Sequence, residues 1–158
     1  MTGTPVVELY AGPRAGLRPL FELAEDSAAQ LDTYLDQGDV LVARIDDDGV
    51  GHLQLVGTGR PGEVELKNMA VDESLQGTGI GRRLVHAAFE HARSRGAHRM
   101  LVATATADIG NLRFYQRVRF RMVAVDRDAF VPATGYPDDI VIDGIVLRDR
   151  VWLDTDLG

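Results

Sequence analysis

The chain has 158 residues, 45% of them hydrophobic and 26% charged, a composition that predicts one globular domain over residues 1–158. Its formal net charge of −7 argues against nucleic acid or an anionic membrane as a partner and favours a cationic small molecule or a basic peptide. The absence of cysteine excludes disulfides and thiolate catalysis, and no stretch reads as a signal peptide or a bilayer-spanning segment, so we expect a cytoplasmic protein.

The first third of the chain predicts strands and a helix pair. Residues 5–10 favour a strand, and residues 14–35 place apolar side chains at helical spacing. Because Asp26 and Ser27 in the middle of that stretch can cap a second helix, we expect two helices with a break there. Residues 39–45 and 50–57 predict a hairpin, joined by an aspartate-rich turn that ends in glycine.

The centre of the chain combines a strand, a glycine-rich turn and a helix. Residues 62–72 alternate polar and apolar side chains, residues 76–81 contain three glycines, and residues 84–92 form an apolar helical stripe that Gly96 ends. Glycines let several backbone N–H groups converge, and the helix N-terminus adds the positive end of its dipole. This stretch therefore predicts a cradle that binds an anion, and phosphate is the expected anion.

The last third alternates short strands with a helix and a loop. We expect, in chain order, a strand at 99–105, a helix capped by Asp108 and running to 118, a strand at 120–126, a long loop at 129–143 and a closing strand at 145–153.

The spacing of the glycines separates the known phosphate cradles. A P-loop is excluded because Lys67, the only lysine, precedes the glycines, and a dinucleotide turn is disfavoured because residues 99–105 carry no acidic residue. The pattern Q/R-x-x-G-x-G/A remains, met by Gln76, Gly79 and Gly81. A capped turn that binds nothing stays open as an alternative.

This pattern, after a strand that ends Met-Ala-Val-Asp, resembles the GNAT superfamily of N-acetyltransferases over most of the chain. The resemblance implies an α/β (α+β-like) fold: a mixed, mainly antiparallel seven-stranded sheet flanked by about four helices, in which the strands at 62–72 and 99–105 are parallel and splayed. It also implies transfer of acetyl from acetyl-CoA to an amine by direct attack in a ternary complex, with no metal. The amine can belong to a small molecule or a peptide.

The resemblance assigns the coenzyme to the centre of the chain. It places the pyrophosphate on residues 76–81 and the pantetheine arm on the backbone of the preceding strand, where the Val71 N–H is a candidate oxyanion donor. Arg82 can add a phosphate contact, and Asn111 lies one helical turn before the tyrosine discussed next. The expected coenzyme-binding residues are Met69, Ala70, Val71, Gln76, Gly77, Thr78, Gly79, Ile80, Gly81, Arg82 and Asn111.

Two residues are candidates for proton transfer. Tyr115, in a phrase like F-Y-x-x-x-G-F, matches the family's general acid, and a phenol keeps its proton at neutral pH; a core aromatic is the alternative. Glu65, four residues before Met69, matches a glutamate that acts as base in some relatives; a solvated strand face or an ion pair with Lys67 explains it equally well. The chain departs from the family pattern at Arg119, where glycine is usual.

Other features carry less chemistry. His86 and His91 are five residues apart on one helix, which does not suit a zinc pair, and we expect all four histidines at the surface or partly buried. The acidic loop after residue 126 can recognise a cation or be solvated, and the strands at 120–126 and 145–153 offer a pairing surface for a homodimer. A domain that senses acyl-CoA without turnover, and a transferase of another acyl group or to a hydroxyl, remain as rivals.

Overall fold

The structure is a computed structural model that describes residues 3–158 of the chain. Its elements are β1 (Val6–Leu9), α1 (Arg18–Glu22), α2 (Ala28–Tyr34), β2 (Asp39–Ile45), β3 (Asp48–Gly57), β4 (Glu63–Val71), α3 (Ile80–Ser94), β5 (Arg99–Ala105), α4 (Ile109–Arg117), β6 (Arg121–Asp126), β7 (Val141–Ile142), β8 (Ile145–Val146) and β9 (Arg150–Asp156). Short 3-10 turns occupy Arg14–Leu17, Glu73–Leu75 and Pro132–Thr134. Within residues 3–158, none of the helices is both long and apolar enough to cross a membrane.

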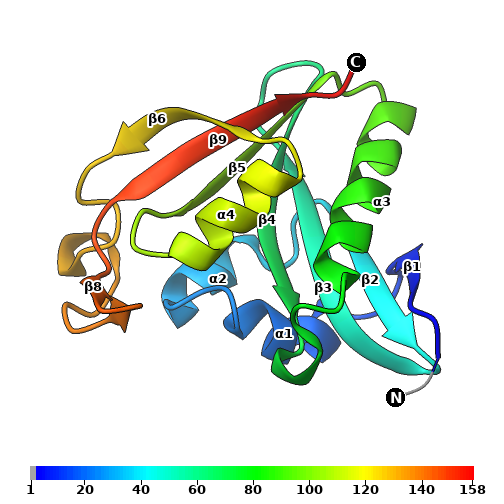
Figure 1. The fold of residues 1–158 in the computed structure, drawn as a ribbon, viewed down its shortest axis with the longest axis horizontal. Helices are drawn as coiled ribbons and strands as arrows, with labels where there is room; N and C mark the ends of the chain where they lie inside the picture. Colours follow the sequence, from blue (N-terminus) through cyan, green and yellow to red (C-terminus); the bar gives the residue numbers. More distant parts are fainter. Residues whose placement is uncertain (1–2) are drawn as a thin grey trace.

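Seven strands form one sheet in the order β1-β2-β3-β4-β5-β9-β6 (Figure 1). Only β4 and β5 run parallel, and every other neighbouring pair is antiparallel. The predicted mixed, mainly antiparallel seven-stranded sheet with flanking helices is therefore confirmed. The parallel pairing extends only from Glu63 opposite Arg99 to Leu66 opposite Val102, and beyond this point β5 pairs with β9 alone.

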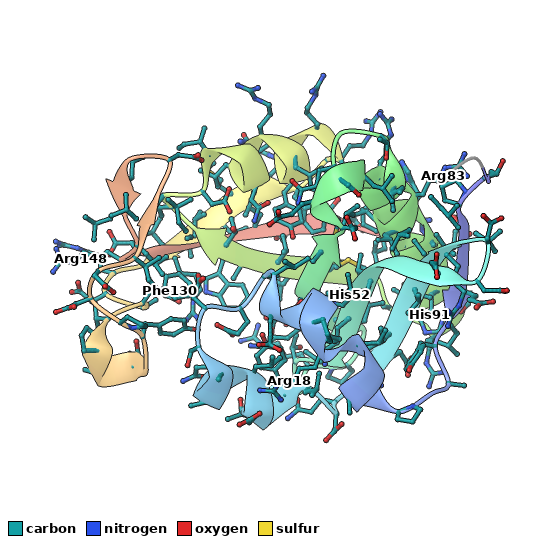
Figure 2. The ribbon with its side chains drawn as sticks, turned by 90° about the horizontal axis from the view of Figure 1, so that it is seen from below. Arg18, His52, Arg83, His91, Phe130 and Arg148 are labelled. Atoms are coloured by element: carbon teal, nitrogen blue, oxygen red, sulfur yellow. The ribbon has the colours of Figure 1, made fainter. Side chains whose placement is uncertain are left out.

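The sheet lies between two helical layers, α1 and α2 on one face and α3 and α4 on the other (Figure 2). The face of α3 that packs on the sheet consists of Ile80, Leu84, Val85, Ala88, Phe89 and Ala92, all buried. On the opposite face, Phe21 and Leu31 of the helix pair pack on Val40 and Val42 of β2. Because α1 and α2 cover β2 to β4, the β9 side chain of Trp152 on that same face stays half-buried.

The helix pair has the predicted break. Ser27 caps α2, and its hydroxyl accepts a hydrogen bond from the Gln30 N–H at 3.2 Å. Ser27 is itself buried, which holds the start of α2 against the body of the domain.

The C-terminal prediction was wrong in part. Residues 145–153 are not one strand, because Asp143 and Gly144, with φ of 52° and 79°, make a two-residue turn that folds Ile145 back onto Ile142. This Asp-Gly pair is a strong hairpin signal that was read as loop. The strand that completes the sheet begins at Arg150 and runs on to Asp156. The loop at 129–143 correspondingly contains a 3-10 turn and β7.

Candidate active site

The glycine-rich turn joins β4 to α3 and leaves an open cradle at the helix N-terminus. Gly77 and Gly79 have φ of 79° and 93°, a left-handed conformation that other residues rarely adopt. A Cβ atom built on either glycine would meet no atom within 4 Å, so the space beside them is open. Gly79 caps α3 with its backbone only, and the first N–H groups of the helix have no side-chain cap. The cradle can therefore bind an anion through backbone groups.

The third glycine of the turn, Gly81, is needed for close packing and not for its backbone conformation. A Cβ on Gly81 would lie 3.1 Å from Cε of Met69 and 3.3 Å from the ring of Phe114, so glycine lets α3 approach both β4 and α4. The first residue of the pattern, Gln76, donates its side-chain amide to the carbonyl of Val71 at 3.2 Å. The turn is thus tied to the end of β4, while the exposed Arg82 follows on the first turn of α3.

The end of β4 has unpaired backbone groups. The Asp72 N–H donates to the Val50 carbonyl at 2.8 Å, and hydrogen bonding alternates along an antiparallel pair, so Ala70 bonds to β3 while the polar groups of Met69 and Val71 point away from it. They point toward β5, which has already separated from β4 beyond Leu66. Among the described residues, the N–H and C=O groups of Met69 and the N–H of Val71 therefore point into the gap, whereas the Val71 carbonyl accepts from Gln76 and the backbone of Ala70 is used within the sheet.

Tyr115 lies on α4 and packs against Phe114 and Phe120 at ring-centroid distances of 5.3 and 5.7 Å. Burial, with the nearby carboxylate of Asp108 as a smaller cause, raises the pKa of its hydroxyl above the ordinary tyrosine value. Among residues 3–158 its hydroxyl has no hydrogen-bonding partner. The side chain is therefore a core aromatic and, at the same time, a protonated phenol with an unused donor.

The start of α4 orders the segment beside Tyr115. Asp108 caps the helix by accepting a hydrogen bond from the Asn111 N–H at 2.9 Å, as its sequence position predicted. The side-chain amide of Asn111 donates to Thr104 of β5 at 3.3 Å, so it holds α4 to the sheet. At the other end of α4, Arg119 takes the left-handed φ of 82° where glycine is usual, and the Phe120 N–H reaches back across it to the Tyr115 carbonyl at 3.0 Å.

Glu65 lies on the sheet face that α1 and α2 leave half-covered, one residue before β4 loses its pairing with β5. Its closest charged partner is Lys67, whose Nζ is 3.9 Å from Oε2, too far for a good hydrogen bond. Burial raises the pKa of Glu65, and the charges of Lys67 and Arg150 oppose that rise. By contrast, Glu63 on the same face is hydrogen-bonded by Thr58 and by Arg99, the latter at 2.7 Å, and these bonds lower the pKa of Glu63. Of these two carboxylates, Glu65 is the one equipped to take up a proton.

A chain of hydrogen bonds crosses the floor of this face. Nε2 of His52 lies 2.7 Å from the Asn68 amide oxygen, and the Asn68 amide donates to the Tyr34 hydroxyl at 3.0 Å. Tyr34 in turn donates to one carboxylate oxygen of Glu25, and Tyr136 donates to the other, at 2.9 and 2.8 Å. The chain connects β3, β4, α2 and the loop after β6, so it fixes the positions of the elements that surround Glu65.

His52 is the one histidine whose environment was predicted wrongly. Its side chain is fully buried, with its ring 4.1 Å from that of Phe21, and Figure 2 shows it between α1 and the strands. Burial lowers the pKa of His52 to about 4 despite the bond to Asn68, and Nδ1 has no partner in residues 3–158. The imidazole is therefore neutral at physiological pH and is part of the buried hydrogen-bond chain beneath this face.

Aromatic and charged side chains lie beside Glu65 on the same face, on β6, β9 and the loop after β6. Asp126 at the end of β6 accepts hydrogen bonds from Arg150 and from the indole N–H of Trp152, both at 2.8 Å, and these bonds lower the pKa of Asp126. Phe130 packs edge-on against Tyr136 in the loop between β6 and β7, beside α2 (Figure 2). This face of the sheet therefore combines aromatic side chains with an excess of carboxylates.

Glu65 lies just before the point where β4 and β5 separate, Met69 and Val71 lie beyond it, and the glycine turn follows the end of β4. Sequence reasoning missed Glu25, Tyr34, Asn68 and Trp152, whose contacts join distant parts of the chain. No local spacing could have found them, although Trp152 is the only tryptophan. In the described part of the chain no group of three or more metal-ligating side chains comes together.

Comparison with known proteins assigns this architecture. The model of the acetyltransferase (GNAT) family matches residues 8–120. The chain is 38% identical over 151 residues to the uncharacterized N-acetyltransferase YvbK of Bacillus subtilis (strain 168), covering 96% of both chains.

Two solved structures agree with that assignment. An acetyltransferase from Bacillus subtilis, crystallised in complex with CoA, is 37% identical with a TM-score of 0.88, covering 98% of this chain and 100% of that one. A GNAT family acetyltransferase from Elizabethkingia anophelis with acetyl-CoA bound is 25% identical, also with a TM-score of 0.88, covering 96% and 97%. With the family model, the relative and the shared fold in agreement, the chain belongs to the GNAT family of acetyltransferases and is an acyltransferase.

Proposed function

We propose that residues 1–158 form one N-acetyltransferase domain that moves acetyl from acetyl-CoA to an amine by direct attack in a ternary complex. The observation that carries this proposal is the meeting of three features at the end of β4. The glycine cradle follows β4, and free backbone groups of Met69 and Val71 line the gap to β5. Glu65 lies on the face of the sheet that α1 and α2 cover, opposite to the face that α3 and α4 cover.

The cradle suits the diphosphate of the coenzyme. Gly77 and Gly79 leave open space beside the N-terminus of α3, and the backbone N–H groups there are donors without a side-chain cap. Arg82 adds a cation on the first turn of the helix, with Thr78 and Ile80 completing the turn. The solved relatives that bind CoA and acetyl-CoA support this assignment through their common fold.

The backbone at the gap suits the remainder of the coenzyme. Acetyl-CoA supplies the thioester whose carbonyl an amine attacks. The free N–H and C=O groups of Met69 can hold an extended amide-bearing arm as an added strand would, and the Val71 N–H can donate to the oxygen on which negative charge develops. Asn111 keeps α4 close enough to the gap to border it.

Two side chains divide the proton transfers. Glu65 accepts a proton from the acceptor's ammonium, which leaves the neutral amine that attacks, because burial has moved the pKa of Glu65 upward and no arginine forms an ion pair with it among the described residues. Tyr115 gives a proton to the departing sulfur, because its hydroxyl stays protonated and has no other hydrogen bond among the described residues. Attack is direct, since the chain has no cysteine to form a thioester of its own.

The face of the sheet on which Glu65 lies favours a cationic amine as acceptor. Glu25, Asp26 and Glu65 supply negative charge there, and burial raises the pKa of Asp26, with Glu25 as the next cause. Arg150 on this face is already neutralised by Asp126. A small amine or a peptide amine with an apolar neighbour to lie against Trp152 suits these side chains best.

The test begins with binding. Calorimetric titration with acetyl-CoA, free CoA, NAD and ATP should give selective micromolar binding of the two coenzyme A species, because their arm uses the β4 gap as well as the cradle. A screen for free thiol over a set of amines should then identify acceptors. Coenzyme binding with no turnover on any amine would favour a sensing domain, and equal binding of NAD or ATP would contradict the assignment of the gap.

The role of Glu65 is tested by the pH profile of kcat/KM. A base must be deprotonated to act, so activity should fall as the pH drops through the raised pKa of Glu65, and Glu65→Gln should remove this limb and slow turnover about tenfold or more at neutral pH. Glu63→Gln is the matched control, because its carboxylate is bound to Arg99 and should leave the limb in place.

A further inference from the structure

Lys67, the only lysine of the chain, occupies an unusual position on β4. Leu66 pairs with Leu55 and Asn68 pairs with Gln54, so Lys67 is an extra residue at a bulge with no partner on β3. Its side chain lies on the face of α2, where Nζ is 4.8 Å from the centre of the Tyr34 ring and 3.9 Å from Oε2 of Glu65. The bulge thus places an amine on the face that we assign to the acceptor.

This amine is not used by the fold. Among residues 3–158 the Lys67 Nζ donates no hydrogen bond, and its two contacts are a ring face and a carboxylate at 3.9 Å. The side chain is 34% exposed, so a molecule bound on this face can reach it. The arginines on the same face differ, because Arg99 and Arg150 each donate to carboxylates at 2.7–2.8 Å.

The distance to the gap suits a lysine side chain. A strand rises about 3.3 Å per residue, so Cα of Lys67 lies roughly 7 Å from Cα of Met69, whose backbone groups open onto the gap. The flexible four-carbon stem of lysine can cover such a distance. From the α2 face, the amine would approach the gap from the side on which an external amine enters.

We propose that Lys67 is a site of self-acetylation: when no acceptor is present, its amine takes the acetyl group from acetyl-CoA bound to the same molecule. This inference rests on the proposed function. The Lys67 ammonium first gives a proton to Glu65, and the neutral nitrogen attacks the thioester carbonyl. The new C–N bond forms as the C–S bond breaks, and the sulfur takes a proton from Tyr115. Glu65 passes its first proton to water and then takes up the second proton of the nitrogen. One of these two protons returns to the Tyr115 oxygen and the other is released. The products are N-acetyllysine, free CoA thiol and one net proton.

Acetylation would change the site as well as mark it. The charge of Lys67 is the largest influence that holds down the pKa of Glu65 against burial. An acetylated side chain has no charge, so the pKa of Glu65 rises further and the acid limb of activity moves to higher pH. Lys67→Gln should reproduce this displacement of the limb, whereas Lys67→Arg should keep the limb in place and provide no acceptor.

The experiment uses the full chain with acetyl-CoA and no added amine. Intact mass should rise by one acetyl group, and peptide mapping should place that group on Lys67. The first-order rate should not change with protein concentration, because donor and acceptor belong to one molecule. A rate that rises in proportion to protein concentration, or an acetyl group found elsewhere, would overturn the proposal.

Two comparisons separate this reaction from simple chemical acetylation. Lys67→Arg should lose the modification completely. Gly79→Glu keeps Lys67 but places a carboxylate in the cradle. Acetylation of Lys67 in this variant should be at least roughly a hundredfold slower, because the reaction loses its bound, oriented donor. Equal rates in Gly79→Glu and the unaltered chain would mean that acetyl-CoA in solution is sufficient, and would refute self-acetylation.

The proposed function is measured in the same preparation, by coenzyme titration and by thiol release with an added amine. A protein that binds coenzyme and acetylates that amine, yet leaves Lys67 unmodified without it, contradicts the self-acetylation alone. A protein that binds no coenzyme contradicts the proposed function and the self-acetylation with it.

Discussion

The two halves of the proposed site would recognise their ligands by different means. On the coenzyme side, the turn after β4 presents backbone groups, and its conformation and open space require glycine. On the acceptor side, recognition depends on side chains. Glu25, for example, accepts hydrogen bonds from two tyrosines, one of them 111 residues away in the sequence.

This difference has a physical consequence. A backbone cradle depends on φ angles and open space, so it tolerates changes of most side chains and fails abruptly when a glycine is replaced. The acceptor side depends on a network whose members satisfy one another, so single changes there should shift stability and pH response in graded steps. Four substitutions test this contrast.

The largest effect is expected from Gly79→Glu. Its φ of 93° disfavours any side chain, and a carboxylate in the cradle repels phosphate, so coenzyme affinity should fall at least about a thousandfold, or about 4 kcal/mol. Gly59→Glu is the matched control, since Gly59 has a φ of 90° and open space but lies in the turn between β3 and β4. Calorimetry should show normal coenzyme binding for Gly59→Glu. Retained affinity in Gly79→Glu would contradict the assignment of the phosphate site to the cradle.

The next effect concerns the floor of the acceptor side. Because burial lowers the pKa of His52 from 6.5 to about 4, the unfolded chain binds the proton more readily, and stability falls as the pH drops from 6.5 toward 4. This group should account for a loss of about 3 kcal/mol in the free energy of unfolding across that window. His52→Gln should lack that part of the pH dependence in urea titrations. Parallel pH curves for the two proteins would mean that His52 is not the group responsible.

Tyr115→Phe should separate catalysis from folding. The hydroxyl has no hydrogen bond to residues 3–158, so its removal should leave stability and coenzyme affinity nearly unchanged while kcat falls roughly a hundredfold. Tyr10→Phe is the control, because the Tyr10 hydroxyl donates to Pro13 before α1 and should not affect kcat. Unchanged turnover in Tyr115→Phe would leave Tyr115 with a packing role only.

The smallest effect is a gain. Arg119 holds a left-handed φ of 82° after α4, at a cost of about 1 kcal/mol for a residue with a Cβ atom. Arg119→Gly should raise the free energy of unfolding by about that amount. Arg117→Gly, two residues earlier within α4, should lower it, and thermal unfolding of the pair compares them directly. A loss of stability in Arg119→Gly would show that the arginine side chain contributes more than its backbone costs.

The sequence by itself determined the elements that local chemistry specifies. The strand at Arg99–Ala105, the helix that ends before Gly96, the caps at Ser27 and Asp108 and the glycine cradle all depend on residues within a few positions of one another. The family and the fold could therefore be predicted, and the coenzyme-binding residues remain a prediction. The Asp143-Gly144 hairpin was equally local and was missed because the surrounding prolines and aspartates favoured a loop.

Only the tertiary structure decided the acceptor half. Whether Glu65 faces open solvent depends on how far α1 and α2 extend over the sheet, and the hydrogen-bond chain from His52 to Glu25 joins β3, β4, α2 and the connection between α1 and α2. The bulge that turns Lys67 and Asn68 to one face also breaks the alternation from which strand faces are predicted. Such contacts arise from packing between distant segments, and the order of residues along the chain carries no direct record of them.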